Sequence, residues 1–258
     1  MIVRIMSKPN EAVTFDGLQS RLSGVLHHPP GESNAGIVLA HCFTCSKSYK
    51  VIRYLADGIA DGGYTVLRFD FTGLGESEGE FEDTSVTTNV ADLMSAVDFL
   101  KDQGFETAAM VGHSLGGAAT LLAAHRLAEV KAAAVLASPA TTEHVRRAFS
   151  KVDVETALET GKVRVEIAGR PFDISAEFFR DLDRHGTLDH VTEMGRPILV
   201  VHPTADRIVE IEEGERIFAA ARQPKWFVAI PGANHLFTNK EHSGFAARVV
   251  VEFLDAVI

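Results

Sequence analysis

Short apolar runs alternate with longer amphipathic stretches along most of the chain. Gly36–His41 (GIVLAH) is almost continuously apolar, which is typical of a strand buried on both faces. We predict strands over Glu11–Phe15, Arg21–His27, Gly36–His41, Tyr64–Phe71, Ala108–Gly112, Ala132–Ala137, Pro197–His202 and Trp226–Ile230. We predict helices over Ser46–Gly62, Asn89–Leu100, Leu115–Val130, Glu212–Ala221 and Phe245–Val257. This alternation favours an α/β fold, a mostly parallel sheet of about eight strands flanked by helices.

One stretch, residues 139–195, interrupts the alternation. Helix-like pieces around His144–Phe149 and Ala176–Leu182 flank Val163–Ser175, where alternating apolar residues and a glycine-containing turn predict a β-hairpin. An antiparallel hairpin between two core strands indicates an insertion. We therefore expect one core domain with residues 139–195 as a small inserted cap, the core being residues 1–138 and 196–258.

Composition narrows the classes of partner and location. The chain has 258 residues, of which 46% are hydrophobic, and a formal net charge of −10. Such a surface repels phosphate backbones and anionic lipid, so we expect neither nucleic acid nor a membrane as a partner. Two cysteines do not make a disulfide framework. Met1–Asn10 lacks the features of a signal peptide, and we expect a cytoplasmic protein.

The most informative motif is the hexapeptide Gly112–Gly117 (GHSLGG). A Gly-x-Ser-x-Gly sequence by itself can be an ordinary turn, but here a predicted strand precedes it and a predicted helix follows. That setting is typical of a nucleophile elbow, which holds its serine in a strained conformation with the hydroxyl exposed. Side chains at Gly112 or Gly116 would collide with neighbouring backbone. We predict that Ser114 is a nucleophile.

An alkyl hydroxyl becomes a good nucleophile only when a neighbouring base takes its proton. In folds built around this elbow, the acid and then the histidine follow the serine in the sequence. Asp206 follows the strand that ends at His202, and His235 follows the strand that ends at Ile230. Parallel strands bring both loops to the edge of the sheet that carries the elbow. The sequence predicts a Ser114–His235–Asp206 triad.

An oxyanion intermediate needs two preset N–H donors. We assign one to the backbone of Leu115, which follows the nucleophile, and the other to the backbone of Phe43. The loop that contains Phe43 also contains Cys42 and Cys45, a C-x-x-C pair. A zinc site would need two further Cys or His ligands at suitable spacing, and no second pair exists. We expect these cysteines to be small packing residues, with a thiol-redox protein as an alternative.

Three segments together resemble a known family: HCFTCSK (His41–Lys47), RFDFTGLGESEGEFED (Arg68–Asp83) and the GHSLGG elbow. They are similar to α/β-hydrolases related to bacterial feruloyl-type esterases, above all the hydrolase portion of proteins fused to an OsmC-like domain. The likeness covers nearly the whole chain, and HCFTCSK and AGRPF in the hairpin are its more specific motifs. The resemblance implies an α/β-hydrolase fold, the same triad and the same two amide donors. The sequence ends at Ile258 without an OsmC-like domain, so we expect no transfer of a role in peroxide defence.

These observations predict a serine hydrolase that cleaves a small or medium carboxylic ester through an acyl-enzyme on Ser114, with neither cofactor nor metal. Two alternatives stay open: a thioesterase or amidase with the same triad, and a catalytically idle hydrolase fold that binds a partner. In the insertion, Phe172 and Phe178 are expected to form part of the acyl pocket. The acidic run Glu76–Asp83 is expected to be a solvated loop. The sequence leaves a homodimer open.

Overall fold

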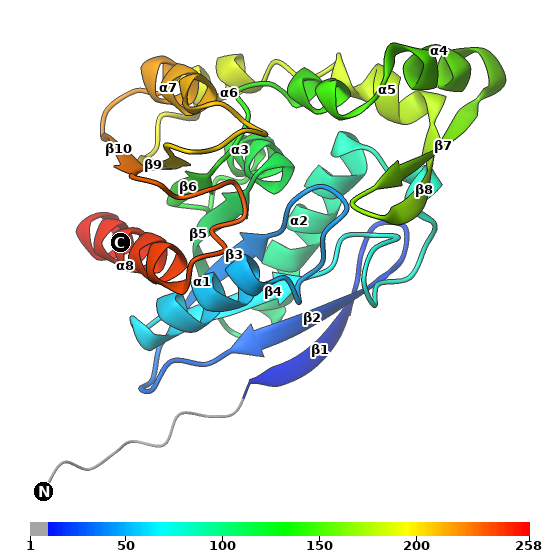
Figure 1. Cartoon of the computed structure of the whole chain (residues 1–258). Coiled ribbons are helices and arrows are strands. Elements are labelled where there is room, and N and C mark those ends of the chain that lie inside the picture. Colours follow the sequence, from blue (N-terminus) through cyan, green and yellow to red (C-terminus); the bar gives the residue numbers. More distant parts are fainter. Residues whose placement is uncertain (1–9) are drawn as a thin grey trace, which may run out of the picture.

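The computed structural model describes residues 10–258, and an eight-stranded sheet runs through the centre of that part of the chain (Figure 1). The strand order is β1-β2-β4-β3-β5-β6-β9-β10. Only β2 runs antiparallel to its neighbours; the other strands share one direction. The strands are β1 (Glu11–Asp16), β2 (Arg21–His27), β3 (Ala35–Ala40), β4 (Thr65–Phe69), β5 (Glu106–His113), β6 (Ala132–Leu136), β9 (Ile198–Pro203) and β10 (Lys225–Ile230).

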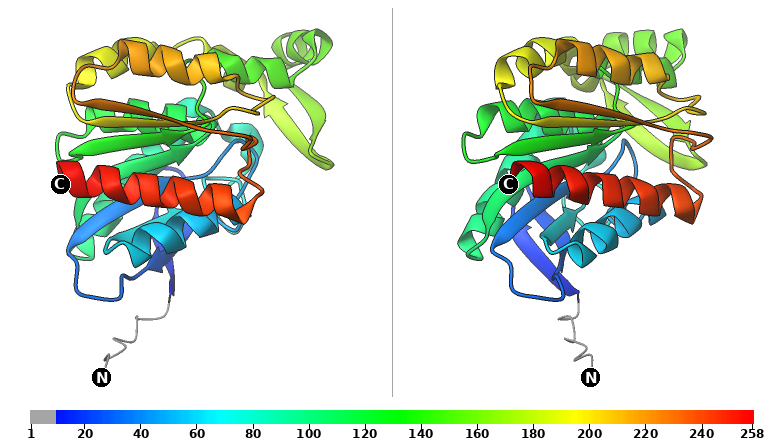
Figure 2. Two further views of the ribbon diagram at one scale, coloured as in Figure 1. Left: turned by 60° about the vertical axis from the view of Figure 1, so that its left-hand side comes forward. Right: turned by 90° about the vertical axis from the view of Figure 1, so that its left-hand side faces the viewer.

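Helices cover both faces of the sheet because its strands are apolar on both sides. In β3, Ile37 and Leu39 belong to the apolar cluster that includes α1 and α8, whereas Val38 belongs to the cluster on the opposite face. Figure 2 shows α1 and α8 side by side on one face. The helices of the sheet are α1 (Lys50–Asp61), α2 (Val86–Asp102), α3 (Leu115–Arg126), α6 (Thr187–Met194), α7 (Ile211–Ala220) and α8 (Lys240–Val257).

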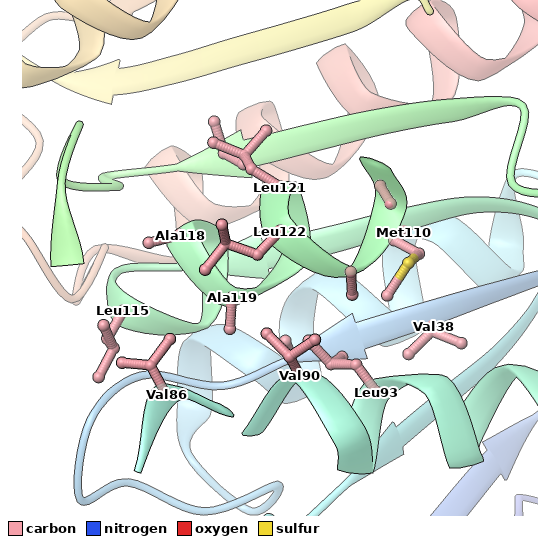
Figure 3. Packing of buried hydrophobic residues seen from close by; sticks show 14 of the residues in the cluster. Val38, Val86, Val90, Leu93, Met110, Leu115, Ala118, Ala119, Leu121 and Leu122 are labelled. Carbon is pink, nitrogen blue, oxygen red and sulfur yellow. The ribbon is translucent and has the colours of Figure 1, made fainter. Parts of the chain in front are cut away.

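Helix α3 is buried on all sides from Leu115 to Ala124, as expected for a helix that is apolar all round. Its small residues, Ala118 and Ala119 among them, let α2 approach closely. Figure 3 shows Val90 and Leu93 of α2 directed at this surface. The central position of α3 fixes its N-terminus, and that N-terminus immediately follows Ser114.

The segment between β6 and α6 leaves the sheet. It contains η2 (Thr142–Ala148), α4 (Lys151–Thr160), the hairpin β7 (Lys162–Ile167) and β8 (Arg170–Ser175), and α5 (Ala176–Leu182). The hairpin pairs only with itself, as a separate two-stranded sheet. A further short helix, η1 (Phe81–Asp83), lies against β8. The predicted hairpin and the predicted helix at Ala176–Leu182 are confirmed.

The structure differs from the prediction at three places in residues 139–195. The helix expected around His144–Phe149 is a 3₁₀ helix, η2. Helix α4 was not predicted, although Ser150 and Asp153 form a capping box that marks its start. Helix α6 was also missed. It packs against α3 and α7 beside the sheet, with Val191 and Met194 buried, so this part of the insertion covers the core. Residues 1–9, the start of the expected core domain and most of the segment without signal-peptide features, lie outside the described residues.

Within residues 10–258, no helix combines the length and the apolar character that crossing a bilayer requires.

We predict that Asp92→Asn raises the stability of the fold at pH 8. Asp92 lies on α2, is 2% exposed, and accepts hydrogen bonds from the amide (2.8 Å) and hydroxyl (3.1 Å) of Thr72. Burial raises the pKa of Asp92 from 3.8 to about 6. Above that pH the fold holds a buried charge that the amide lacks, whereas near pH 4 the wild-type carboxyl is protonated in the folded state. Urea unfolding should show a gain of about 2–3 kcal/mol at pH 8 that shrinks toward pH 4.

Asp181→Asn is the matched control with the opposite sign. Asp181 is equally buried, but it accepts hydrogen bonds from the Thr87 amide (2.9 Å), the Thr87 hydroxyl (2.7 Å) and His185 (3.1 Å). Burial alone would raise the pKa of Asp181, and these partners outweigh it and lower the pKa. The charged form therefore stabilises the fold above the ordinary pKa, and the asparagine variant should lose stability at pH 8. Equal effects of the two substitutions would contradict this assignment.

Candidate active site

Ser114 occupies the tight turn between β5 and α3, with φ 56° and ψ −129°. A positive φ is rare for a non-glycine residue and stores strain of about 1–3 kcal/mol. The Ser114 hydroxyl does not cap the helix that it precedes. A Cβ added at Gly112 would lie 2.4 Å from the Gly116 carbonyl oxygen, and one at Gly116 would lie 2.1 Å from the His41 carbonyl oxygen. The predicted close approach at both glycines is confirmed.

Ser114, His235 and Asp206 form a continuous chain of hydrogen bonds. The Ser114 Oγ lies 3.0 Å from His235 Nε2, and His235 Nδ1 lies 2.8 Å from Asp206 Oδ2. A carboxylate only accepts, so His235 donates through Nδ1, and in the neutral ring Nε2 accepts from the Ser114 hydroxyl. The structure thus brings the three predicted residues together from loops after β5, β9 and β10.

The Asp206 carboxylate is held by its own loop as well as by His235. Its Oδ1 accepts from the amides of Ile208 (2.9 Å) and Val209 (3.0 Å). Burial would raise the pKa of Asp206, but the hydrogen bonds from His235 and these two amides outweigh it and lower the pKa. Asp206 therefore stays ionised and keeps the His235 ring in one tautomer.

Two further buried histidines support this chain. His113 Nε2 donates to the main-chain carbonyl of His235 (2.7 Å). Burial is the main cause that lowers the pKa of His113 to about 3, and the neighbouring His235 is the second. His202, to which the sequence assigned no role, is fully buried in β9. Its Nε2 donates to the Val209 carbonyl (3.0 Å), closing the loop that carries Asp206. Its position in an apolar strand is the feature of the sequence that indicates this burial.

The β3–α1 loop, residues 41–47, carries the predicted amide donor of Phe43. Among residues 10–258, neither the Phe43 amide nor the Leu115 amide donates a hydrogen bond. Both residues line the same cavity, which has a free volume of about 10 Å³ and is bordered by His41, Cys42, Phe43, Thr44, Phe71, Leu74, Phe81, Thr84, Asn89, Leu115, Gly116 and Phe178. Two unengaged N–H groups on residues that border one cavity can stabilise a negative charge that develops there.

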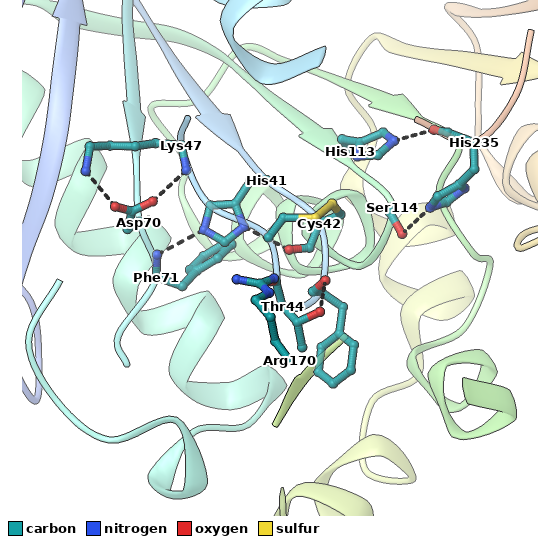
Figure 4. Close-up of a disulfide and its surroundings, with 12 residues drawn as sticks. His41, Cys42, Thr44, Lys47, Asp70, Phe71, His113, Ser114, Arg170 and His235 are labelled. Atoms are coloured by element: carbon teal, nitrogen blue, oxygen red, sulfur yellow. Dashed lines mark hydrogen bonds and ion pairs between the residues drawn. A yellow bond between two sulfur atoms is a disulfide. The ribbon is translucent and has the colours of Figure 1, made fainter. Parts of the chain in front are cut away.

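The expectation that Cys42 and Cys45 are small packing residues did not include a bond between them. Both side chains are buried, at 4% and 7% exposure, but a disulfide joins them across the turn (Figure 4). The Cys45 amide donates to the Cys42 carbonyl (3.1 Å), and Thr44 adopts a positive φ of 56°. The sequence does not reveal the bond because two cysteines three residues apart approach only when the backbone turns this way.

The far end of the β3–α1 loop is fixed to the end of β4 by a buried ion pair between Lys47 and Asp70, which the exposed Glu76 extends. Lys47 Nζ lies 2.6 Å from Asp70 Oδ2 and 2.7 Å from Glu76 Oε2. The Lys47 carbonyl accepts from Arg68 (2.7 Å). Glu76 belongs to the acidic run that was expected to be a solvated loop, and Glu82 of the same run pairs with Lys162 of the hairpin. Within residues 10–258, no group of three or more His, Cys, Asp or Glu side chains is arranged to hold a metal ion.

The insertion contacts the β3–α1 loop directly. The Phe178 ring of α5 stacks on Phe43, with 5.4 Å between ring centroids, and the Arg170 guanidinium donates to the Thr44 carbonyl. Phe172 does not line the cavity. Its ring packs against Phe81, which does, with 5.0 Å between ring centroids. Of the two insertion residues predicted at an acyl pocket, Phe178 borders the cavity and Phe172 contacts it only through Phe81.

Comparison with known proteins places the chain in a family. Residues 37–248 match the Alpha/beta hydrolase family. The chain belongs to this family. The esterase domain of a Rhodothermus marinus protein is 36% identical, with a TM-score of 0.77 over 95% of this chain and 98% of that one.

Two further proteins are similar to this chain at lower identity. Est1E from Butyrivibrio proteoclasticus, solved with ferulic acid bound, is 24% identical, with a TM-score of 0.83 over 95% of this chain and 99% of that one, a likeness of fold alone. Palmitoyl-protein thioesterase ABHD10 of Pongo abelii is 28% identical over 158 residues, which is 57% of this chain and 49% of that protein.

We predict that Gly116→Ala destabilises this hydrolase by about 2–3 kcal/mol, since a Cβ 2.1 Å from the His41 carbonyl forces backbone to move. Gly31→Ala is the matched control, because a Cβ at Gly31 meets no atom within 4 Å. Urea unfolding of both variants measures the difference. A Gly116 variant as stable as the Gly31 variant would show that the elbow does not press on β3.

Proposed function

We propose that this alpha/beta hydrolase is a serine esterase that cleaves carboxylic esters through an acyl-enzyme on Ser114. The observation that carries the proposal is the hydrogen-bonded chain Ser114–His235–Asp206, at 3.0 and 2.8 Å, beside the unengaged amides of Phe43 and Leu115. The 36% identical esterase domain from Rhodothermus marinus supports the same reaction class.

In the first half of the reaction, His235 Nε2 takes the Ser114 proton while Oγ forms a bond to the ester carbonyl carbon. The carbonyl π electrons move to oxygen, and the Phe43 and Leu115 amides stabilise the oxyanion. As the intermediate collapses, the bond to the alcohol oxygen breaks. The imidazolium, held by Asp206, gives its proton to that oxygen.

In the second half, water replaces the alcohol. His235 takes a proton from the water as its oxygen bonds to the acyl carbon, and the same two amides stabilise the second oxyanion. The bond to Ser114 Oγ then breaks, and Oγ receives the proton from His235. A carboxylic acid leaves, and the enzyme returns to its starting state. No cofactor is required at any step.

We further propose that the acyl group is small. The cavity beside Phe43 and Leu115 has a free volume of about 10 Å³, which is about the space that one water molecule needs. The stacked rings of Phe43 and Phe178 close one side of it. Any acyl group must therefore displace an aromatic ring to enter, and an acetyl group requires the least displacement.

A thioesterase is the second candidate, and the likeness to the Pongo abelii palmitoyl-protein thioesterase favours it. The same triad and amides would cleave a thioester, since only the leaving atom differs. The small cavity argues for a short acyl group here too. Parallel assays with an acetate ester and an acetyl thioester of similar leaving-group pKa would separate the two candidates by their kcat/KM values.

We predict that Ser114→Ala lowers ester turnover by at least about 1,000-fold, because the variant lacks the nucleophile. The assay is hydrolysis of p-nitrophenyl acetate, with circular dichroism to verify folding. Ser138→Ala is a matched control, because the Ser138 hydroxyl is buried nearby but donates only to the Pro139 carbonyl (3.1 Å). A fluorophosphonate probe should label the wild type and not the Ser114 variant. An unlabelled, inactive wild type would instead favour the catalytically idle binding module.

We predict that Phe178→Ala extends the range of acyl chains. Removing a ring that borders the cavity should raise the butyrate-to-acetate ratio of kcat/KM by about 10-fold, since a methylene contact changes such ratios by 10-fold or more. Phe172→Ala is the control and should leave the ratio unchanged, because that ring contacts Phe81 rather than the cavity. An unchanged ratio in both variants would remove the insertion from the acyl site.

A further inference from the structure

Each ring nitrogen of His41 forms a hydrogen bond with a main-chain group, one with an N–H donor and the other with a carbonyl acceptor. His41 is fully buried at the end of β3, with Nε2 3.2 Å from the Phe71 amide nitrogen and Nδ1 2.8 Å from the Cys42 carbonyl oxygen (Figure 4). An amide can only donate and a carbonyl can only accept. Nε2 therefore carries no proton, and Nδ1 carries one. The two contacts select a single neutral tautomer.

The surroundings of His41 keep the ring in that neutral form. Burial lowers the pKa of His41, and the charge of the neighbouring Lys47 acts in the same direction. The hydrogen bond to Cys42 and the charge of Asp70 raise the pKa, but burial outweighs them. The ring packs edge-on against Phe71, with 4.8 Å between centroids. A protonated ring would have no acceptor for the Phe71 amide.

The contact to Cys42 determines where the next amide points. The Cys42–Phe43 peptide bond is trans, so its carbonyl and the Phe43 N–H point in opposite directions. The carbonyl accepts from His41 Nδ1 and from the Cys45 amide (3.1 Å). Holding the carbonyl toward His41 turns the Phe43 N–H to the opposite side of the peptide, and Phe43 lines the same cavity as Leu115.

The opposite orientation of this peptide would disable the site. If the peptide flipped, the Cys42 carbonyl would face the cavity, and a carbonyl oxygen repels a developing oxyanion. Without the bond from His41, the Cys45 amide would be the remaining hydrogen-bond donor to this carbonyl, in a turn that the Cys42–Cys45 disulfide also closes. Loss of one oxyanion donor lowers kcat by about 100- to 1,000-fold in serine hydrolysis.

We propose that His41 is a positioning residue for ester hydrolysis: through Nδ1 it fixes the Cys42–Phe43 peptide so that the Phe43 amide faces the oxyanion. The assignment rests on the proposed function, because only a reaction that forms an oxyanion gives this amide its role. His41 touches neither substrate nor Ser114 and acts through the peptide alone.

The test is a pair of variants, each of which keeps one hydrogen bond of the His41 ring and removes the other. An asparagine side chain places its amide nitrogen near the position of Nδ1, so His41→Asn keeps the donor to Cys42 and loses the contact to Phe71. His41→Gln reaches the position of Nε2, so it keeps the contact to Phe71 and loses the donor to Cys42. We expect His41→Asn to retain kcat within about 10-fold and His41→Gln to lose about 100- to 1,000-fold. KM for p-nitrophenyl acetate should change little in either variant.

The melting temperature separates positioning from a structural role. Each variant loses one buried hydrogen bond, so both should melt at similar, lowered temperatures. Equal losses of kcat that follow the loss of stability would overturn the positioning role. Ser114→Ala, assayed beside them, keeps the two hypotheses apart. If that variant is active, the proposed function fails; if it is inactive while the two His41 variants behave alike, only the role of His41 fails.

A measurement on the wild-type protein remains decisive if a variant does not fold. The ¹⁵N chemical shifts of the His41 ring distinguish a protonated Nδ1 from a protonated Nε2. We expect the Nδ1–H tautomer across the pH range in which the enzyme is active. An Nε2–H tautomer, or a ring that gains a second proton within that range, would leave the Cys42 carbonyl without the proposed control and would overturn the inference.

Discussion

The backbone at the start of α3 presses against the His41 carbonyl so closely that only glycine fits at position 116. This contact joins the strained turn of Ser114 to the β3–α1 loop, two segments that are more than 60 residues apart. It brings the amides of Leu115 and Phe43 to one cavity. Because α3 is buried on all sides, the turn cannot relax by moving outward. The strain at Ser114 is maintained by packing around it.

Around this contact, the fold uses buried neutral histidines as rigid connectors. His41, His113 and His202 are fully buried, and each holds a main-chain carbonyl of the segment beside it: Cys42, His235 and Val209. Burial lowers the pKa of each ring, so none of them changes charge near neutral pH. An imidazole suits this task because it donates through one nitrogen while it stays uncharged.

The insertion supplies no member of the triad. It contributes to the site by packing against the β3–α1 loop. Phe178 stacks on Phe43, and Arg170 donates to the Thr44 carbonyl, so α5 and the hairpin both rest on the β3–α1 loop. Asp181 ties α5 to the first turn of α2 through Thr87. The same segment that closes the cavity is thereby anchored to the helix layer of the sheet.

Local sequence was sufficient for the fold class, the strands and helices outside residues 139–195 and the grouping of Ser114, Asp206 and His235. Each of these depends on short-range patterns: period-two and period-3.6 apolar spacing, a glycine-flanked serine, and residues that directly follow parallel strands. The disulfide depended on how the backbone of the β3–α1 loop turns. The helix α6 beside α3 and the burial of His202 depended on the tertiary structure, because each is set by which segments come to lie together. The same holds for the tautomer of His41. Its two partners are backbone groups of Cys42 and Phe71, and backbone groups leave no signature in a sequence.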